Sequence, residues 1–143
     1  MKRRKGRGRL VLWLIILATL SALAWIRFAP SAVAQWHVDP HVTANQDLAD
    51  GVRRRLPAEP GRMEALDAII RATPRTRVLA GSARDGFVTY VTRSKWFGFP
   101  DYTTVRQENG QIGIWGRLRF GLSDMGVNKA RVDGWLASLD KTP

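Results

Sequence analysis

The hydrophobic pattern of the chain begins with one long apolar run near the N-terminus. Leu10 to Ile26 reads LVLWLIILATLSALAWI and contains no charged residue. As a helix with a rise of about 1.5 Å per residue, this run is roughly 26 Å long, close to the hydrocarbon thickness of a bilayer. Residues 10–28 are therefore predicted to form a transmembrane helix or the apolar core of a signal sequence.

Helical periodicity returns at Pro60, a residue type favoured in the first turn of a helix. The apolar residues that follow at spacings of three and four are Met63, Leu66, Ile69 and Ile70. Thr73-Pro74 ends this pattern. A last helix is predicted to start near Asn128, and its apolar face consists of Val132, Trp135, Leu136 and Leu139.

Between these helices the period of the pattern is two, which is typical of strands. RVLAGS and FVTYVTRS flank Asp85-Gly86, and DYTTVR and QIGIWGRLRF flank Asn109-Gly110, and both dipeptides are hairpin signals. The order helix, four strands, helix predicts an α+β domain in which an antiparallel four-stranded sheet carries both helices on one face. We assign this domain to residues 60–143. Residues 29–59 have no sustained period and are predicted to be a linker and docking segment.

The Asn109-Gly110 turn also predicts which residues of its two strands stand opposite each other. With a two-residue turn, paired residues have numbers that sum to 219. The core face of the last strand then holds Ile112, Ile114, Leu118 and Phe120. The other face places Tyr102 opposite Arg117 and Thr104 opposite Trp115, with Arg119 two residues further on. This face is predicted to be an aromatic and cationic strip.

The net charge of +11 is distributed unevenly along the chain. Six basic residues and no acidic ones occupy positions 1–9, and the other 17 basic residues accompany 12 acidic residues. The remaining excess is ordinary for a solvated domain, so the high isoelectric point does not indicate a nucleic-acid partner. The basic tail before the apolar run, with Arg27 alone after it, predicts a cytoplasmic N-terminus. Everything after the run is then extracytoplasmic, in the periplasm of a Gram-negative source.

A cleaved signal sequence is the alternative to an anchor. Ala32-Val33-Ala34 before Gln35 has the small-x-small pattern of a signal-peptidase site, and cleavage there would secrete the domain to the periplasm. The apolar run is longer than the usual signal core of about 7–15 residues, and Arg27 and Pro30 interrupt the approach to the site. An uncleaved, single-pass anchor in the inner membrane is therefore favoured, with Trp13 and Trp25 at its two interfaces.

Residues with catalytic potential are scarce. The absence of cysteine excludes a disulfide framework, a thiolate metal site and a lipid-modified cysteine anchor. The sequence contains neither a nucleophile elbow nor a phosphate-binding glycine loop. His37, Asp39 and His41 are of metal-ligating types, but Pro40 argues against a helix that would bring both imidazoles together. We therefore predict no catalytic residue, metal or cofactor, and a hydrolase-like enzyme is the least favoured class.

The aromatic and cationic strip is the candidate ligand site. A guanidinium beside an aromatic ring suits a carboxylate, a phosphate or a lipid headgroup. The candidate binding residues are Arg117, Arg119, Tyr102, Trp115, Ser123, Asp124 and Asn128. Asn128 is placed to cap the last helix, whose free amides attract anions. A purely structural interpretation stays open, in which Arg117 and Tyr102 form a cross-strand pair worth about 0.2–1 kcal/mol and Asp124 pairs with an arginine.

The segments FPDYTTVR and RLRFGLSDMGVNKARVDGWL resemble the bacterial and plastid family known as domain of unknown function 1499. Its signature, R-S-R-x-G-x-S-D-x-G-V-N-R-x-R-(V/I), is matched by Arg117, Arg119, Gly121, Ser123, Asp124, Gly126, Val127, Asn128 and Arg131. Leu118 and Gly116 stand where the family has Ser, and Lys129 where it has Arg. The resemblance covers roughly residues 74–139, and the PNCVS-like segment of many relatives has no counterpart here. WHVDP and the N-terminal span are similar to a membrane-anchored proteobacterial branch.

Two further segments have open alternatives. KWFGFP places Trp96, Phe97 and Phe99 between two strands, where we expect the aromatics to fold back over one end of the core, with contact to a membrane or partner as the alternative. Arg53-Arg54-Arg55 is expected to be a solvated charge run, with contact to anionic lipid headgroups as its alternative. Trp36 is expected to be an interfacial or docking aromatic.

Taken together, these features predict a membrane-anchored extracytoplasmic protein that acts as a non-catalytic binding module for an anionic small molecule or lipid headgroup. The alternative is a structural or interaction protein that docks on another cell-envelope protein through the aromatic loop or the Trp115 face.

Overall fold

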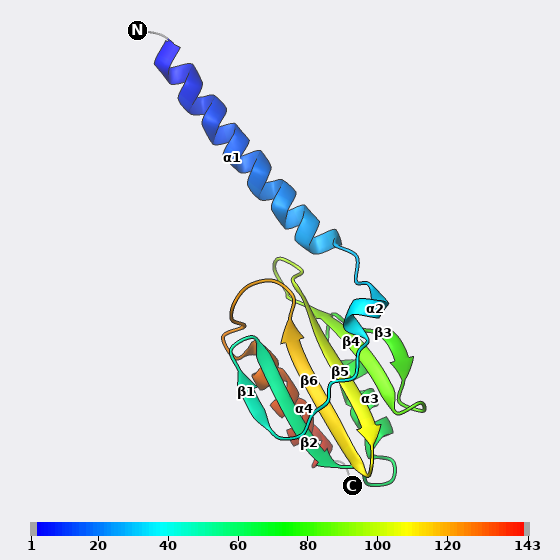
Figure 1. Cartoon of the computed structure of the whole chain (residues 1–143). Coiled ribbons are helices and arrows are strands. Elements are labelled where there is room, and N and C mark those ends of the chain that lie inside the picture. Colours follow the sequence, from blue (N-terminus) through cyan, green and yellow to red (C-terminus); the bar gives the residue numbers. More distant parts are fainter. Residues whose placement is uncertain (1–2, 142–143) are drawn as a thin grey trace. The chain divides into compact units, whose positions relative to one another are not determined.

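The computed structural model describes residues 3–141, which form two compact units divided between Pro30 and Ser31 (Figure 1). The first unit contains helix α1, Arg3–Phe28. Within it, Gly6–Phe28 contains an 18-residue window with a mean hydropathy of 2.1 and is long and apolar enough to cross a membrane. Signal sequences share this property. The prediction of an N-terminal apolar helix is confirmed.

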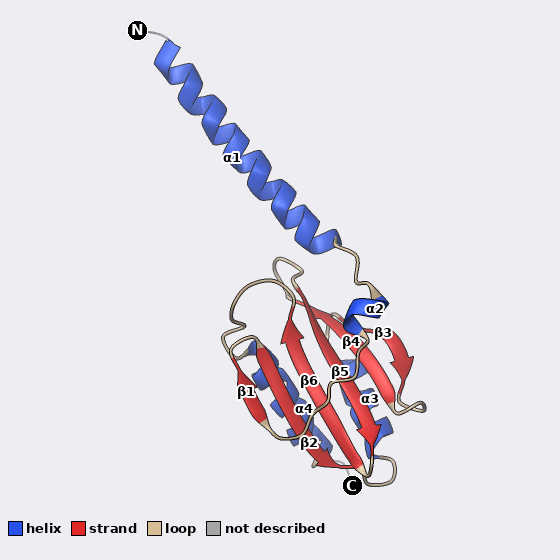
Figure 2. Ribbon diagram, viewed as in Figure 1, coloured by secondary structure: helices blue, strands red, loops and turns tan. Residues whose placement is uncertain are grey.

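The second unit is an α+β domain built on a six-stranded sheet. The strands are β1 (Gln46–Leu48), β2 (Gly51–Pro57), β3 (Thr76–Ser82), β4 (Phe87–Arg93), β5 (Pro100–Glu108) and β6 (Gln111–Leu118). Their order in the sheet is β1-β2-β6-β5-β4-β3, and every neighbouring pair is antiparallel. Helices α3 (Arg62–Ala72) and α4 (Val127–Leu139) both cover one face, while the short helix α2 (Val33–Trp36) and the chain after it cross the other (Figure 2).

The prediction of four strands is wrong, because residues 46–57 form two more strands beside β6. Strand β2 alternates correctly, with Val52 and Leu56 on the helix side of the sheet. Arg54 lies between them on that same side, where it bonds Asp133 of α4. Three consecutive arginines therefore obscure the alternation of apolar and polar residues, and the sequence of this segment resembles that of a polar linker.

The predicted pairing of the β5–β6 hairpin is confirmed. Tyr102 stands opposite Arg117, and Thr104 opposite Trp115. Ile112 and Ile114 are fully buried, but Leu118 and Phe120 are only partly buried and lie outside the core cluster, so their assignment to the core is wrong. Leu118 is the last residue of β6, and Phe120 lies two residues beyond it, where the chain leaves the sheet.

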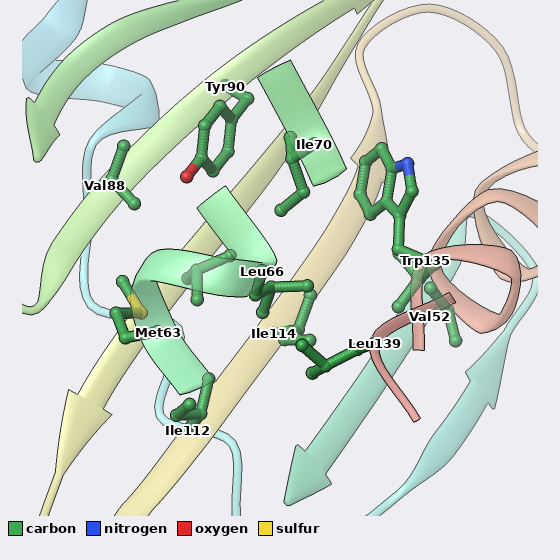
Figure 3. Close-up of a cluster of buried hydrophobic side chains, with 12 residues drawn as sticks. Val52, Met63, Leu66, Ile70, Val88, Tyr90, Ile112, Ile114, Trp135 and Leu139 are labelled. Carbon is green, nitrogen blue, oxygen red and sulfur yellow. The ribbon is translucent and has the colours of Figure 1, made fainter. Parts of the chain in front are cut away.

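The core lies between the sheet and the two helices (Figure 3). Met63, Leu66 and Ile70 of α3 are buried against the sheet, and Ile69 packs against the same cluster. Trp135 of α4 is buried, and its indole Nε1 donates to the Thr73 hydroxyl at 2.7 Å, which ties α4 to the end of α3. The apolar stripes predicted for both helices are therefore confirmed as core faces, with Leu136 partly buried.

Candidate functional site

The outer face of the sheet is crossed by residues 31–45, which we call the N-terminal strap. The Trp36 ring stacks on Tyr102 with centroids 3.8 Å apart and an angle of 11° between planes. The His37 ring stacks on Phe87, also at 3.8 Å. Trp36 is thus a docking aromatic, as the sequence suggested, and it docks on the domain's own candidate site.

Two further contacts fasten the strap along the sheet. The Asp39 carboxylate pairs with Arg106 of β5, with Nε and Oδ2 2.9 Å apart. Val42 packs over Gly113 of β6, where a Cβ would lie only 3.0 Å from the Val42 Cβ. The glycine therefore lets the strap approach the backbone of the sheet closely.

Arg117 holds the strap at the centre of the aromatic and cationic strip. Its Nη2 donates to the main-chain carbonyl of Trp36 at 2.7 Å, and its Nη1 donates to the Thr104 hydroxyl at 3.1 Å. The guanidinium carbon lies 4.0 Å from the centroid of Trp115 and 5.4 Å from that of Trp36. Arg117 thus lies between two indole rings and is only 6% exposed.

No carboxylate among the described residues lies within 4.0 Å of the Arg117 guanidinium. This sets it apart from other inward-facing arginines, because Arg54, Arg62 and Arg131 all have ion pairs although their side chains are more exposed. Burial lowers the pKa of Arg117 to about 10, so the side chain still carries its charge at neutral pH. The strip therefore contains a buried cation that has no acidic counter-charge within 4.0 Å among the residues that the structure describes.

Two other arginines flank this buried cation. Arg53 of β2 lies over Trp115, with its guanidinium carbon 5.0 Å from the ring centroid. Arg119 lies 4.9 Å from the Phe120 centroid and donates to the Tyr102 hydroxyl at 3.1 Å. Both side chains are half-buried. The contribution of Arg53 could not be predicted from the sequence, because the three consecutive arginines obscure the alternating pattern of β2.

A row of hydroxyl groups continues the strip toward His37. The hydroxyl of Thr104, which accepts from Arg117, lies 3.0 Å from the hydroxyl of Thr89. Thr89 in turn lies 2.9 Å from His37 Nδ1. Both threonines are fully buried, and burial lowers the pKa of the His37 imidazole.

The chain from β6 to α4 is stabilised by Asp124. Its carboxylate oxygens accept from the main-chain N–H groups of Gly126 at 2.9 Å and Asn128 at 3.0 Å. Asp124 therefore caps α4, and the prediction that Asn128 caps the helix is wrong. The reason is the helix boundary: α4 begins at Val127, so Asn128 is already inside its first turn, and Gly126 takes the preceding left-handed position with φ 80°. The alternative in which Asp124 pairs with an arginine finds no such ion pair among the described residues.

Asn128 and Ser123 have local partners in the same joint. Asn128 is fully buried, and its side-chain oxygen accepts from Arg131 Nη1 at 2.8 Å. Arg131 also pairs with Asp101 of β5 at 3.2 Å, which links α4 to the sheet. Burial raises the pKa of Asp101, and Arg131 counteracts part of that rise. The Ser123 hydroxyl accepts from the Met125 N–H at 3.1 Å. Ser123, Asp124 and Asn128 thus form the strand-to-helix joint, whereas Arg117, Arg119, Tyr102 and Trp115 form the strip.

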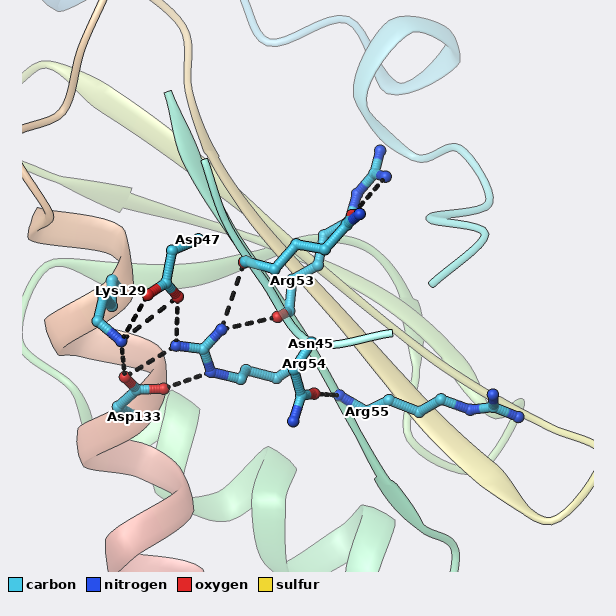
Figure 4. Close-up of polar contacts among 8 residues, drawn as sticks. Asn45, Asp47, Arg53, Arg54, Arg55, Lys129 and Asp133 are labelled. Carbon is cyan, nitrogen blue, oxygen red and sulfur yellow. Dashed lines mark hydrogen bonds and ion pairs between the residues drawn. The ribbon is translucent and has the colours of Figure 1, made fainter. Parts of the chain in front are cut away.

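The arginine run of β2 divides between the two faces of the sheet (Figure 4). Arg54 pairs with Asp133 at 2.7 Å and with Asp47 at 2.8 Å, and Lys129 bridges the same two carboxylates. Hydrogen bonds from Arg54 are the main cause that lowers the pKa of both aspartates. The expectation of a solvated charge run is therefore wrong for Arg54, whose side chain is only 11% exposed.

The aromatic side chains of KWFGFP differ in their exposure to solvent. Phe99 is partly buried and makes an edge contact with Phe120 at 6.4 Å. Trp96 is 80% exposed and Phe97 is 55% exposed. Only Phe99 folds back as expected.

The residues of HVDPH do not meet at a common centre, although His41 Nδ1 lies 3.4 Å from an Asp39 carboxylate oxygen. His37 stacks on Phe87, Asp39 pairs with Arg106, and the His41 side chain is exposed. Asp39 and His41 instead line one side of a shallow cavity of about 230 Å³, next to Arg55 and Arg106. In the part of the chain that the structure describes, no three His, Asp or Glu residues group as metal ligands do.

Comparison with known proteins places this strip and joint in a family. A search of curated proteins found no match for the chain. The family model described as "Protein of unknown function (DUF1499)" matches residues 30–139, a range that includes the strap, the strip and the joint. The match begins well before residue 74, where the resemblance in the sequence starts, and it includes the strap. The chain belongs to the DUF1499 family.

Proposed function

We propose that this protein is a membrane-anchored, non-catalytic binding module that holds an anionic group, a carboxylate or a phosphate, at the strip formed by Arg53, Arg117 and Arg119. The observation that carries the proposal is that Arg117 is buried and charged but lacks an ion pair among the described residues. It is the only buried arginine among the described residues, and none of their carboxylates pairs with it.

The energetic cost of this arrangement favours a ligand. Burial lowers the pKa of Arg117 to about 10, which means that burial disfavours the charged guanidinium by a few kcal/mol, on the order of 1.4 kcal/mol for each pKa unit. An apolar residue of similar length at such a position is often neutral or stabilising for a fold. A bound anion beside the guanidinium offsets this cost, and the two flanking arginines add to the attraction.

Two buried hydrogen-bond donors beside Arg117 also favour a bound anion. The indole Nε1 of Trp36 and the Nε of Arg53 are buried and have no acceptor among the described residues. Trp36 lies on the β5 side of Arg117, and Arg53 lies on the β2 side. Gly51 stands opposite Arg117 on β2 and contributes no side chain there. A carboxylate or phosphate has the acceptor oxygens that these donors lack.

The anchor and its orientation are also proposals. The six basic residues before the apolar run support a cytoplasmic N-terminus and a domain in the periplasm or the corresponding extracytoplasmic space. The strap supports an uncleaved anchor, because cleavage after Ala34 would remove Ser31, whose hydroxyl lies 2.6 Å from the Tyr102 hydroxyl. The mass of the mature chain in its membrane tests this directly.

Anion binding is tested by titration calorimetry on the full chain in a non-ionic detergent. The probes are inorganic phosphate, succinate and a short-chain phosphatidylglycerol, so that a free anion and a lipid headgroup are distinguished. Loss of two charged hydrogen-bond donors in Arg53→Gln/Arg119→Gln is expected to weaken binding at least about tenfold.

The matched control is Arg55→Gln/Arg84→Gln, which removes the same charge from two exposed side chains, one bonded to the Thr43 carbonyl of the strap and one in the turn between β3 and β4. It is expected to bind as the wild type does. Equal affinities of both double variants, or no heat with any probe, would contradict the proposal and favour a structural role for the strip.

A further inference from the structure

The end of the sheet at which β5 begins and β6 ends displays an apolar surface to solvent. We call this end the loop end. It carries the β4–β5 loop, residues 94–99, and the β6–α4 loop, residues 119–126. In the first loop, Trp96 and Phe97 are exposed apolar side chains. The second loop also exposes two apolar side chains, because Leu122 is 94% exposed and Met125 is 92% exposed. Phe99 and Phe120 join the two loops by a ring contact.

The exposed side chains stand on loops with defined internal bonds. In the first loop, the Ser94 N–H donates to the Phe99 carbonyl at 2.9 Å, and Arg93 Nη1 donates to the Gly98 carbonyl at 2.8 Å. In the second, the Asp124 N–H donates to the Ala49 carbonyl at 3.1 Å. Met125 has φ 51°, a left-handed conformation that is uncommon for residues other than glycine, asparagine and aspartate. The fold therefore holds these apolar groups outward.

The connection of the domain to α1 lies at the same end. Tyr102 and Arg117 pair one step from the last pair of the β5–β6 ladder, Asp101 and Leu118, and Ser31 bonds the Tyr102 hydroxyl. Helix α1 ends at Phe28. Three chain steps span at most about 11 Å, so chain length alone keeps Ser31 close to the last residue of α1.

From these observations we infer that the loop end of the domain, with Trp96, Phe97, Leu122 and Met125, inserts into the interface of the bilayer that α1 crosses. The occupant is a lipid surface rather than a protein, because the short connection brings this end to the membrane at a high effective concentration. Indole rings favour that interface, and the Lys95 ammonium over the Trp96 ring, 5.1 Å from its centroid, is suited to the headgroup layer.

The charges at the loop end do not oppose insertion. The Asp124 carboxylate accepts two main-chain hydrogen bonds, and Asp101 is paired with Arg131. Asp50, in the neighbouring β1–β2 turn, is exposed and remains in the aqueous headgroup layer. This inference rests on the proposed anchor but not on anion binding, because a phosphatidylcholine surface has no net charge.

Depth measurement by site-directed spin labelling tests the inference on the full chain in phosphatidylcholine vesicles. The natural chain has no cysteine, so single labels at Leu122→Cys and Arg84→Cys are unambiguous. Arg84 lies in the turn between β3 and β4, at the opposite end of the sheet. The ratio of collisions with oxygen to collisions with a water-soluble nickel chelate is expected to be several-fold higher at position 122 than at position 84.

A second pair of variants shows which side chains hold the domain there. Trp96→Ser/Phe97→Ser is expected to lower the ratio at position 122, whereas the control Val38→Ser, which removes an exposed apolar side chain of the strap, is expected to leave it unchanged. Thermal unfolding verifies that each variant folds. Equal ratios at positions 122 and 84 would overturn the inference. Spectral broadening between labels on two copies would replace the lipid surface with a second copy of the chain. Failure of the chain to float with vesicles would overturn the anchor and the insertion together.

Discussion

The guanidinium of Arg117 donates to the main-chain carbonyl of Trp36 across 81 positions of sequence, with 2.7 Å between Nη2 and the oxygen. One end of this bond belongs to the last strand of the sheet, and the other belongs to the strap that follows α1. The side chain that defines the candidate anion site thus also fastens the strap, so the two roles must be separated by experiment.

Arg117→Lys separates the fastening from the charge. Lysine keeps the positive charge but lacks the planar fork that reaches the Trp36 carbonyl and the Thr104 hydroxyl together. We expect a loss of about 1.5–3 kcal/mol in the free energy of unfolding, since hydrogen bonds from a charged group are lost. Hydrogen exchange at the amides of residues 31–37 is expected to accelerate in this variant. Unchanged exchange in the strap would show that Arg117 does not fasten it.

Removal of the carboxylate in Asp124→Ala is expected to destabilise the domain by about 0.5–2 kcal/mol, the usual value of a helix cap. The carboxylate accepts two main-chain N–H groups, whereas the Ser123 hydroxyl accepts one at an exposed position. Ser123→Ala is therefore the matched control, and its effect is expected to be smaller. Urea denaturation of the full chain in detergent measures both. A larger loss in the serine variant would contradict the assignment of the cap.

The stability of the domain is expected to fall as the pH drops from 7.5 to 5, because His37 is folded in its neutral form. Burial lowers the pKa of His37 in the fold below the value of about 6.5 that it has when unfolded. Its contribution is fully present above about pH 6.5 and is lost as the pH falls through the lower folded pKa. His37→Phe keeps a ring on Phe87 and removes the titration, so its melting temperature should depend less on pH over this range. An unchanged slope would rule out His37 as the source.

The aspartates around Arg54 determine stability in a more acidic range. Arg54 lowers the pKa of Asp133 and Asp47, so their contribution is present above about pH 4 and is lost as the pH falls through the lower folded values. Asp133→Asn is expected to cost about 1 kcal/mol at neutral pH and to reduce the loss of stability on acidification. Acid titration followed by circular dichroism measures this, and a variant that unfolds at the same pH with the same slope would contradict it.

The parts of the fold that follow from local pattern were predictable from the sequence, and the parts that depend on distant contacts were not. Asn109-Gly110 was sufficient to predict that Tyr102 faces Arg117, because turn type determines register. Strand β2 could not be predicted, because Arg54 occupies a helix-facing position where an apolar residue is expected. Its charge is neutralised by carboxylates of α4 and β1. That compensation is visible only after folding.

The candidate site was likewise predictable only where it depends on local pattern. The sequence predicts which face of β6 holds Trp115, Arg117 and Arg119, but the stacking of Trp36 on Tyr102 and the burial of Arg117 come from a strap without periodicity. The strip is a candidate anion site, and not only a cross-strand pair, because Arg117 is buried and no carboxylate in residues 3–141 pairs with it. A strap docked over the outer face is a tertiary contact that no local signal in residues 31–45 indicates.

Native mass spectrometry of the full chain extracted from its own membranes tests the central claim most directly. The wild type, Arg53→Gln/Arg119→Gln and the control Arg55→Gln/Arg84→Gln are compared in one non-ionic detergent. The account predicts an anionic species bound to the wild type and to the control and absent from the folded strip variant. The same bare mass for all three folded proteins would contradict it.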